Sequence, residues 1–167
     1  MLQSLITSKT RLRLLVKFFI NVANTGYLRG LASEMQENTN AIRKELNNLS
    51  EAGFIIREEQ NAKVIYKANE LHPFFDLLQQ LVRKHLGIDR IVEQIFERMG
   101  DVNKIYLVGD CAKGVDTGVL EVVVEGVDLN LEYLDYLVLK ISNELNKKVI
   151  IHVVDKFEGG GVLVFEK

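Results

Sequence analysis

The chain of 167 residues has a single cysteine, Cys111, which excludes an internal disulfide framework and a metal site built from several thiolates. One thiol fits a reducing compartment, and we expect a cytoplasmic protein. No apolar run approaches the roughly 20 residues of a membrane span, and Arg11, Arg13 and Lys17 interrupt the apolar start where a signal peptide would lie. With 47% hydrophobic and 26% charged residues, the composition predicts a soluble globular protein without a membrane partner.

Neither sign of charge is in large excess, and the net charge of -2 taken alone argues against a nucleic-acid-binding protein. The charges are unevenly distributed, however. Residues 1–87 carry 12 Lys and Arg against 8 Asp and Glu, a net charge of +4, whereas residues 88–167 carry 9 against 15, a net charge of -6. This asymmetry predicts two units with different partners.

Residues 39–53 predict one short helix with two unlike faces. Asn38 or Thr39 is a suitable N-cap, and Gly53 is suited to end the helix. The apolar face repeats at i, i+4 and i+7 and consists of Ile42, Leu46 and Leu49. The other face offers amide, guanidinium and ammonium groups, which bind base edges and phosphates; it consists of Asn40, Arg43, Lys44 and Asn47. Polar outer faces also occur on ordinary surface helices, so the neighbouring segments decide between the two interpretations.

Those segments favour a DNA-binding motif. Ser8 is a suitable N-cap for a helix over residues 9–22, and a short helix with an apolar stripe follows the turn at residues 24–26. Residues 54–57 and 63–67 are rich in β-branched and aromatic side chains and predict a hairpin with a polar loop at 58–62. Two short helices, the second with a base-contacting face, followed by a hairpin indicate a helix-turn-helix with a wing.

The hairpin and the helix start add expected backbone contacts. Arg57, Lys63 and Lys67 are expected to contact phosphates, which positions a protein on DNA without specifying a sequence. Thr39 is expected near the DNA backbone. Glutamates in the expected loop, Glu58 among them, would repel phosphates and argue against deep insertion of the hairpin.

Two runs carry a resemblance to a known family. Residues 5–15 (L-I-T-S-K-T-R-L-R-L-L) resemble the opening helix of ArsR-type winged helix-turn-helix regulators, and residues 31–55 resemble their A-x-x-x…L-x-x-L-x-x-x-G core. The resemblance covers residues 5–67 and implies a transcriptional regulator whose partner is double-stranded DNA. Residues 27–40 contain no Cys or His, so the thiolate-rich metal-sensing motif of classical members is missing.

Two further apolar stripes follow, in a helix opened by His72-Pro73 and in residues 88–99, and Gly87 separates them. Both would serve as core within the chain. In winged-helix regulators such helices pair two protomers, so the resemblance implies a homodimer that presents two recognition helices to successive major-groove turns. The expected domains are a winged helix (1–70), a helical dimerisation or linker region (71–100) and a small α/β domain (101–167).

The last of these domains is predicted to contain about four strands and one helix, which makes the whole chain α+β. Its turn G-D-C-A-K-G at residues 109–114, followed by T-G-V-L-E-V-V-V, resembles the polymerase-beta-type nucleotidyltransferases. In that family a G-S-x-A-x-G turn holds a triphosphate, and paired carboxylates on the next strand bind two magnesium ions. Asp110 replaces the serine and places an anion where a phosphate would dock. Asp116 and Glu121 lack the i, i+2 spacing that puts two side chains on one strand face.

Two functions remain open on these residues. In the first, which we favour, the domain is catalytically degenerate: the protein is not an enzyme, has no metal or cofactor, and senses a nucleotide or nucleotide sugar. In the alternative, it is a magnesium-dependent nucleotidyltransferase whose winged helix serves targeting or protein binding. Open α/β sheets bind ligands at the ends of their strands, where the expected ligand-binding residues are Gly109, Asp110, Lys113, Gly114, Asp116 and Glu121.

Overall fold

The computed structural model describes residues 2–167 as two units. The first extends to Val82 and includes residues 113–115, and the second comprises residues 83–112 and 116–167. The expected α+β class is confirmed, with one sheet of three strands and one of four among the described residues. The division falls inside helix α5 (Phe75–Leu86), so residues 71–100, which we expected to form one region, belong to both units.

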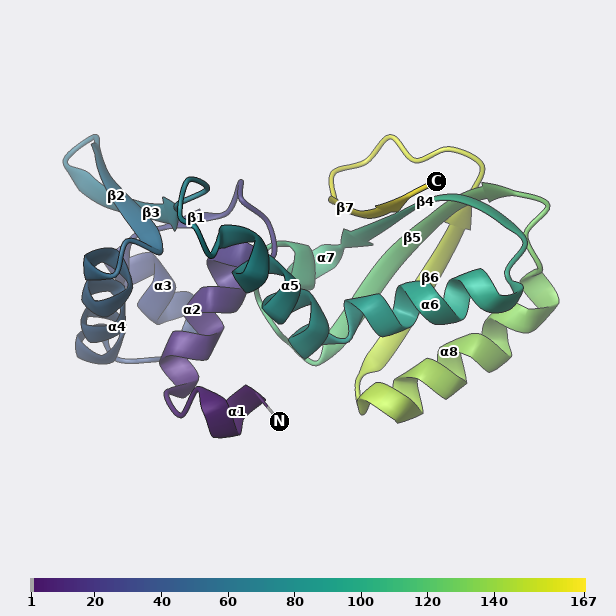
Figure 1. Cartoon of the computed structure of the whole chain (residues 1–167), viewed down its shortest axis with the longest axis horizontal. Helices are drawn as coiled ribbons and strands as arrows, with labels where there is room; N and C mark the ends of the chain where they lie inside the picture. Colours follow the sequence, from purple (N-terminus) through teal and green to yellow (C-terminus); the bar gives the residue numbers. More distant parts are fainter. Residues whose placement is uncertain (1) are drawn as a thin grey trace. The chain divides into compact units, whose positions relative to one another are not determined.

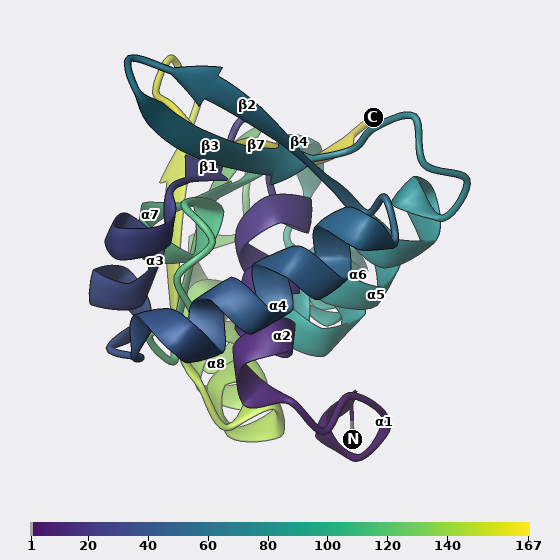
Figure 2. The same cartoon turned by 90° about the vertical axis from the view of Figure 1, so that its left-hand side faces the viewer.

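The first unit combines helices with a small antiparallel sheet of order β1-β3-β2 (Figures 1 and 2). Its elements are α1 (Leu2–Leu5), α2 (Lys9–Phe19), β1 (Thr25–Gly26), α3 (Leu28–Met35), α4 (Thr39–Glu51), β2 (Ile55–Gln60) and β3 (Lys63–Ala68). In Figure 2, α4 crosses in front of α2, and the β2–β3 hairpin lies above α4.

Local side-chain chemistry explains where these helices begin and end. The Ser8 side chain accepts a hydrogen bond from the Arg11 N–H at 3.1 Å, and the Asn38 side chain accepts one from Ala41 N–H at 2.8 Å, so both expected N-caps are confirmed. Gly53 follows α4 with φ +77°, the left-handed conformation that favours glycine after a helix. Helix α2 ends at Phe19, earlier than expected, because the Asn21 side chain accepts from the Ala23 N–H and starts a turn.

The core of the first unit is built from the apolar faces of α2, α3 and α4. The expected stripe of α4 is confirmed: Ile42, Leu46 and Leu49 are between 0% and 4% exposed. They pack in the same core as Leu14 and Phe18 of α2, which are fully buried. Complete burial of an aliphatic side chain contributes roughly 1.5–3 kcal/mol, so this stripe fixes which face of α4 points inward and leaves the polar face outward.

The hairpin is tighter than the sequence suggested. Gln60 pairs with Lys63, so β2 and β3 are joined by a two-residue turn, Asn61-Ala62, and Glu58 and Glu59 lie on β2 rather than in a loop. Both turn residues have positive φ, 50° and 60°, as type I′ hairpin turns require.

The second unit packs helices on one face of a four-stranded sheet of order β6-β5-β4-β7 (Figure 1). Its elements after α5 are α6 (Ile88–Arg98), β4 (Asp101–Val108), α7 (Gly109–Ala112), β5 (Val119–Val127), α8 (Leu131–Leu145), β6 (Lys148–Val154) and β7 (Val162–Glu166). Strands β5 and β6 are parallel and the other pairings antiparallel. Alternate residues of β5 form the covered face and are fully buried: Leu120, Val122 and Val124. The expected four strands are therefore present.

The apolar stripe of residues 88–99 is core of this unit. Ile88, Ile91 and Ile95 on α6 are 0% exposed, and α6 packs against α8. These three residues are core within the chain, whereas Phe96 of the same stripe is 41% exposed. Helix α5 begins at Phe75 rather than at the proline, because the His72 ring accepts a hydrogen bond from the Phe74 N–H in a preceding turn. No helix in residues 2–167 is long and apolar enough to cross a membrane.

Candidate functional site

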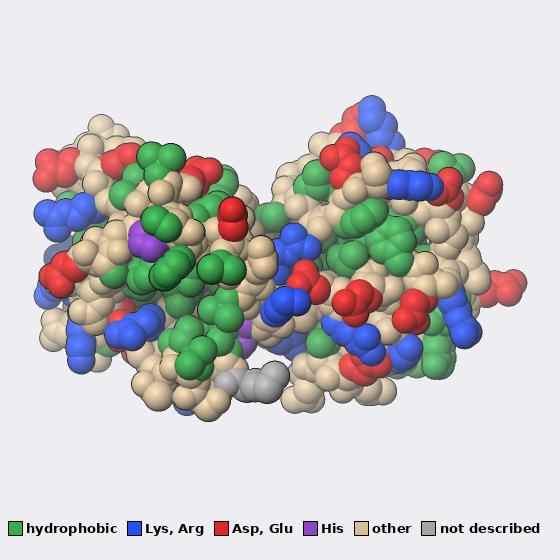
Figure 3. Space-filling view, in the orientation of Figure 1, with side chains coloured by type: hydrophobic (Ala, Val, Ile, Leu, Met, Phe, Trp, Pro, Cys, Tyr) green, Lys and Arg blue, Asp and Glu red, His purple; other side chains and the backbone are tan. Residues whose placement is uncertain are grey.

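The polar face of α4 is open to solvent. The expected base-contacting residues Asn40, Arg43, Lys44 and Asn47 are all exposed, as is Thr39 in the first turn. Arg43 donates a long hydrogen bond of 3.3 Å to the Asn40 side-chain oxygen, so these two groups lie next to each other on the helix surface. Basic side chains are visible along the α4 edge of the unit in Figure 3. The structure thus brings the predicted helix residues together on one face.

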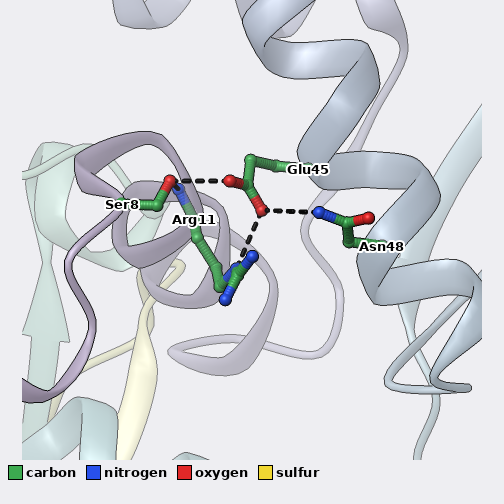
Figure 4. A network of polar contacts seen from close by, with 4 residues as sticks. All are labelled: Ser8, Arg11, Glu45 and Asn48. Atoms are coloured by element: carbon green, nitrogen blue, oxygen red, sulfur yellow. Dashed lines mark hydrogen bonds and ion pairs between the residues drawn. The ribbon is translucent and has the colours of Figure 1, made fainter.

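A polar network on the opposite side of α4 was not predicted from the sequence (Figure 4). Glu45 is 6% exposed, and one of its carboxylate oxygens accepts from the Ser8 hydroxyl at 2.8 Å. The other oxygen accepts from Arg11 Nε at 2.8 Å and lies 3.5 Å from the Asn48 amide nitrogen. The sequence does contain a signal for this network, because Glu45 is a charged residue at a position on the apolar side of the helix.

The network keeps Glu45 ionised. Burial alone would raise the pKa of this carboxyl group, but the hydrogen bonds from Arg11 and Ser8 and the charge of Arg11 together hold its pKa below the usual value. A charge-assisted pair of this kind is directional as well as favourable. Glu45 therefore ties α4 to the first turn of α2.

The three basic residues of the hairpin differ in their surroundings. Arg57 is exposed on β2, and the Lys63 ammonium lies over the Tyr27 ring, 4.7 Å from its centre. Lys67 is paired with Glu58 at 2.6 Å across the strands, and this hydrogen bond lowers the pKa of Glu58. The expectation that Glu58 lies in a loop is wrong: it lies on β2, where it pairs with Lys67 on the neighbouring strand.

The expected ligand-binding residues of the second unit fall into separate groups. Glu121 lies on β5 and its carboxylate is 2.7 Å from His152 Nε2 on the parallel strand β6. Gly109 adjoins this pair: a Cβ at its position would lie 2.6 Å from Glu121 Oε2, so only glycine fits without displacing that side chain. Asp110 is exposed in the short helix α7.

Asp116 is held elsewhere. Its carboxylate accepts from Lys147 Nζ at 2.9 and 3.0 Å and from the Gly118 N–H at 3.1 Å. Burial raises the pKa of Asp116, but the bonds and charge of Lys147 outweigh burial and lower it. Asp116 and Glu121 therefore share no partner.

Lys113 and Gly114 are grouped with the first unit, where the Lys113 carbonyl accepts from Lys17 Nζ at 3.0 Å. A Cβ at Gly114 would lie 2.5 Å from the Lys17 Cα. These two residues are thus placed by α2 rather than by the sheet, and the six expected residues do not form one cleft within the second unit.

The carboxylates Asp116 and Glu121 do not fit the two magnesium ions that the polymerase-beta-type nucleotidyltransferases bind. Within residues 2–167 no group of three or more His, Cys, Asp or Glu side chains is arranged to hold a metal ion. The turn's cysteine, Cys111, is 1% exposed, and burial raises the pKa of its thiol to about 12.

Sequence reasoning missed the partners in this unit, His152 and Lys147. Each lies on or beside β6, and its contact depends on the parallel register of β5 and β6, which no local motif encodes.

No protein-family model, curated protein or solved structure matches the chain. The two candidate sites of the chain are the exposed face of α4 and the Glu121–His152 pair.

Proposed function

We propose that the chain is a DNA-binding transcriptional regulator whose first unit is a winged helix-turn-helix. The observation that carries this proposal is the exposed face of α4, where amide and guanidinium side chains gather on a helix held rigidly by its buried side. An α-helix fits the major groove, arginine pairs with guanine, and asparagine pairs with adenine. Arg43 and Asn47 are the residues assigned to base contacts, with Asn40 and Lys44 beside them.

Other contacts position the helix on the duplex. Arg57 and Lys63 extend from the hairpin that directly follows α4, and Thr39 lies in the first turn, where backbone N–H groups favour phosphate. Lys67 contributes less, since Glu58 already pairs with it. The +4 net charge of residues 1–87 is in keeping with an anionic partner.

We propose that the regulator works as a homodimer. Apolar side chains remain exposed near the start of α5, where Leu71 is 93%, Phe74 55% and Leu77 60% exposed (Figure 3). Contiguous exposed apolar groups commonly mark protein interfaces, and a second copy of this chain would place two α4 helices on one two-fold symmetric site. The isoleucines of α6, Ile88, Ile91 and Ile95, are fully buried in their own unit and are not available to such an interface.

For the second unit we propose a non-catalytic, nucleotidyltransferase-like module that senses a nucleotide or nucleotide sugar. The support for a ligand site is the half-exposed Glu121–His152 pair beside Gly109. The support for a non-catalytic role is that Asp116 is already paired with Lys147. Titration of a nucleotide panel, with and without magnesium, into the full chain by calorimetry tests ligand binding. Turnover that disappears in Glu121→Gln would instead establish the transferase.

The test of DNA binding is a selection of genomic fragments by the full-length protein at near-physiological salt. We expect one enriched, two-fold symmetric site. Because each bidentate base contact contributes about 1–3 kcal/mol, losing two of them costs at least about 2 kcal/mol, and the double variant Arg43→Ala/Asn47→Ala should bind that site at least about 30-fold more weakly. The matched control is Arg98→Ala/Asn143→Ala, which removes the same two residue types from exposed positions in the second unit.

The two variants separate specific recognition from a general loss of charge or stability. The control should bind the selected site like the wild type. If Arg43→Ala/Asn47→Ala also bound it normally, α4 would not be the recognition helix. If the protein enriched no DNA fragment, with or without nucleotides, the first unit would bind protein and not DNA.

A further inference from the structure

We infer that Glu45 is a positioning residue for DNA recognition: by anchoring the inner side of α4 to the start of α2, it sets the direction in which the Arg43 and Asn47 side chains point. The inference rests on the proposed function, because it concerns how the same helix face meets DNA. It assigns a role to a residue that itself faces away from the duplex.

The first step is the geometry of the anchor (Figure 4). Each oxygen of the Glu45 carboxylate has its own donor at 2.8 Å, the Ser8 hydroxyl on one and Arg11 Nε on the other. Ser8 is also the N-cap of α2, since its oxygen accepts from the Arg11 N–H. The carboxylate is therefore bound to a point of α2 that is itself fixed, and two hydrogen bonds from different residues restrain both translation and rotation of α4.

Apolar packing alone does not fix the orientation of α4. Ile42, Leu46 and Leu49 bury one side of α4, but the hydrophobic effect is non-directional and tolerates small slides and rotations of a helix on its neighbour. Base contacts do not tolerate them, because hydrogen bonds weaken steeply with distance and angle. A polar network inside the interface supplies the missing directionality.

The charge of Glu45 also matters for DNA binding. A carboxylate on the recognition helix of a DNA-binding protein opposes the phosphate backbone, so a glutamate at position 45 would weaken binding unless its charge is neutralised. Its side chain is only 8% exposed and is paired with Arg11, which removes most of that repulsion. The same oxygen that binds Arg11 also lies 3.5 Å from the Asn48 amide nitrogen, and Asn48 is exposed directly beside Asn47.

The test is Glu45→Gln in the full-length protein, measured against the selected DNA site and against unrelated duplex DNA. Removing a negative charge from α4 would, through electrostatics alone, strengthen binding to both. The positioning role predicts the opposite at the selected site: about a tenfold weaker affinity, the size of one lost charge-assisted hydrogen bond. Affinity for unrelated DNA should stay equal or rise, so the ratio of specific to non-specific affinity falls.

A second variant covers the case in which Glu45→Gln does not fold. Arg11→Gln removes one donor from the carboxylate at a position whose side chain is 42% exposed. Its matched control is Lys9→Gln, which removes an equal charge from an exposed position of the same helix. We expect the specific-to-non-specific ratio to fall in Arg11→Gln and to stay unchanged in Lys9→Gln.

The outcomes are distinguishable. If folded Glu45→Gln binds the selected site as tightly as the wild type or more tightly, the positioning role is overturned while the proposed function stands. Equal ratios in Arg11→Gln and Lys9→Gln would overturn it as well. If the wild type selects no DNA site, the proposed function fails and this inference fails with it.

Discussion

Replacing Ala62 by glycine should stabilise the first unit, which is the reverse of the usual effect of glycine. Ala62 is the second residue of the β2–β3 turn and has φ +60°. An alanine in the left-handed region costs roughly 1–2 kcal/mol because its Cβ crowds the following carbonyl. Glycine avoids that clash, but it loses more conformational entropy on folding than alanine does, which offsets about 0.5–1 kcal/mol of the gain. We therefore expect a net stabilisation of about 0.5–1 kcal/mol.

Thermal unfolding of the full chain by circular dichroism measures this change. In a unit of this size, 1 kcal/mol corresponds to roughly 4–8 °C in Tm, and slower amide exchange in residues 55–68 would place the effect in the hairpin. The matched control is Ala52→Gly at the end of α4, where φ is -74° and glycine should destabilise by up to about 1 kcal/mol. If both variants were destabilised alike, the turn would not have the left-handed conformation described above.

Two further predictions concern the second unit. Cys111, with its buried thiol and a pKa near 12, should resist iodoacetamide at neutral pH in the folded protein and react after unfolding in urea; rapid labelling of the native protein would contradict its burial. Asp116→Asn should lower the free energy of unfolding by about 1–2 kcal/mol at pH 7, since Lys147 loses a charged partner. The pKa of Asp116 in the folded protein lies below its usual value of 3.8. The difference in free energy of unfolding between the wild type and Asp116→Asn, measured by urea denaturation, should therefore shrink as the pH falls below that value. Asp110→Asn, at an exposed position of the short helix α7, is the control and should change little.

The sequence predicted best what depends on neighbours within one or two helical turns. The caps by Ser8 and Asn38 and the buried face of α4 follow from residue type and a spacing of three or four, and all were found where expected. The hairpin was placed correctly, but its turn was too long in the prediction because glutamates on a strand face look like loop residues in a linear chain.

What could not be predicted depends on contacts between distant segments. Ser8 and Glu45 are 37 residues apart, and Glu121 and His152 are 31 apart. Their pairing depends on how α2 crosses α4 and on the register of two parallel strands, neither of which follows from local periodicity. The candidate ligand site was the least predictable part, since the fold assigns its six residues to different partners.

The pairing of Glu58 with Lys67 has a consequence for how the protein would respond to ionic strength. A lysine that is already neutralised within the protein displaces fewer condensed cations from DNA when it approaches a phosphate. Under the proposed function, Arg57 and Lys63 of the hairpin would carry the cation release, and the affinity for DNA should decline less steeply with salt than the number of lysines and arginines implies. Breaking the pair by Glu58→Gln would free Lys67 and steepen that dependence. Under the proposed DNA-binding function, the hairpin pair would thus set how steeply affinity falls with salt, separately from the base contacts proposed for α4.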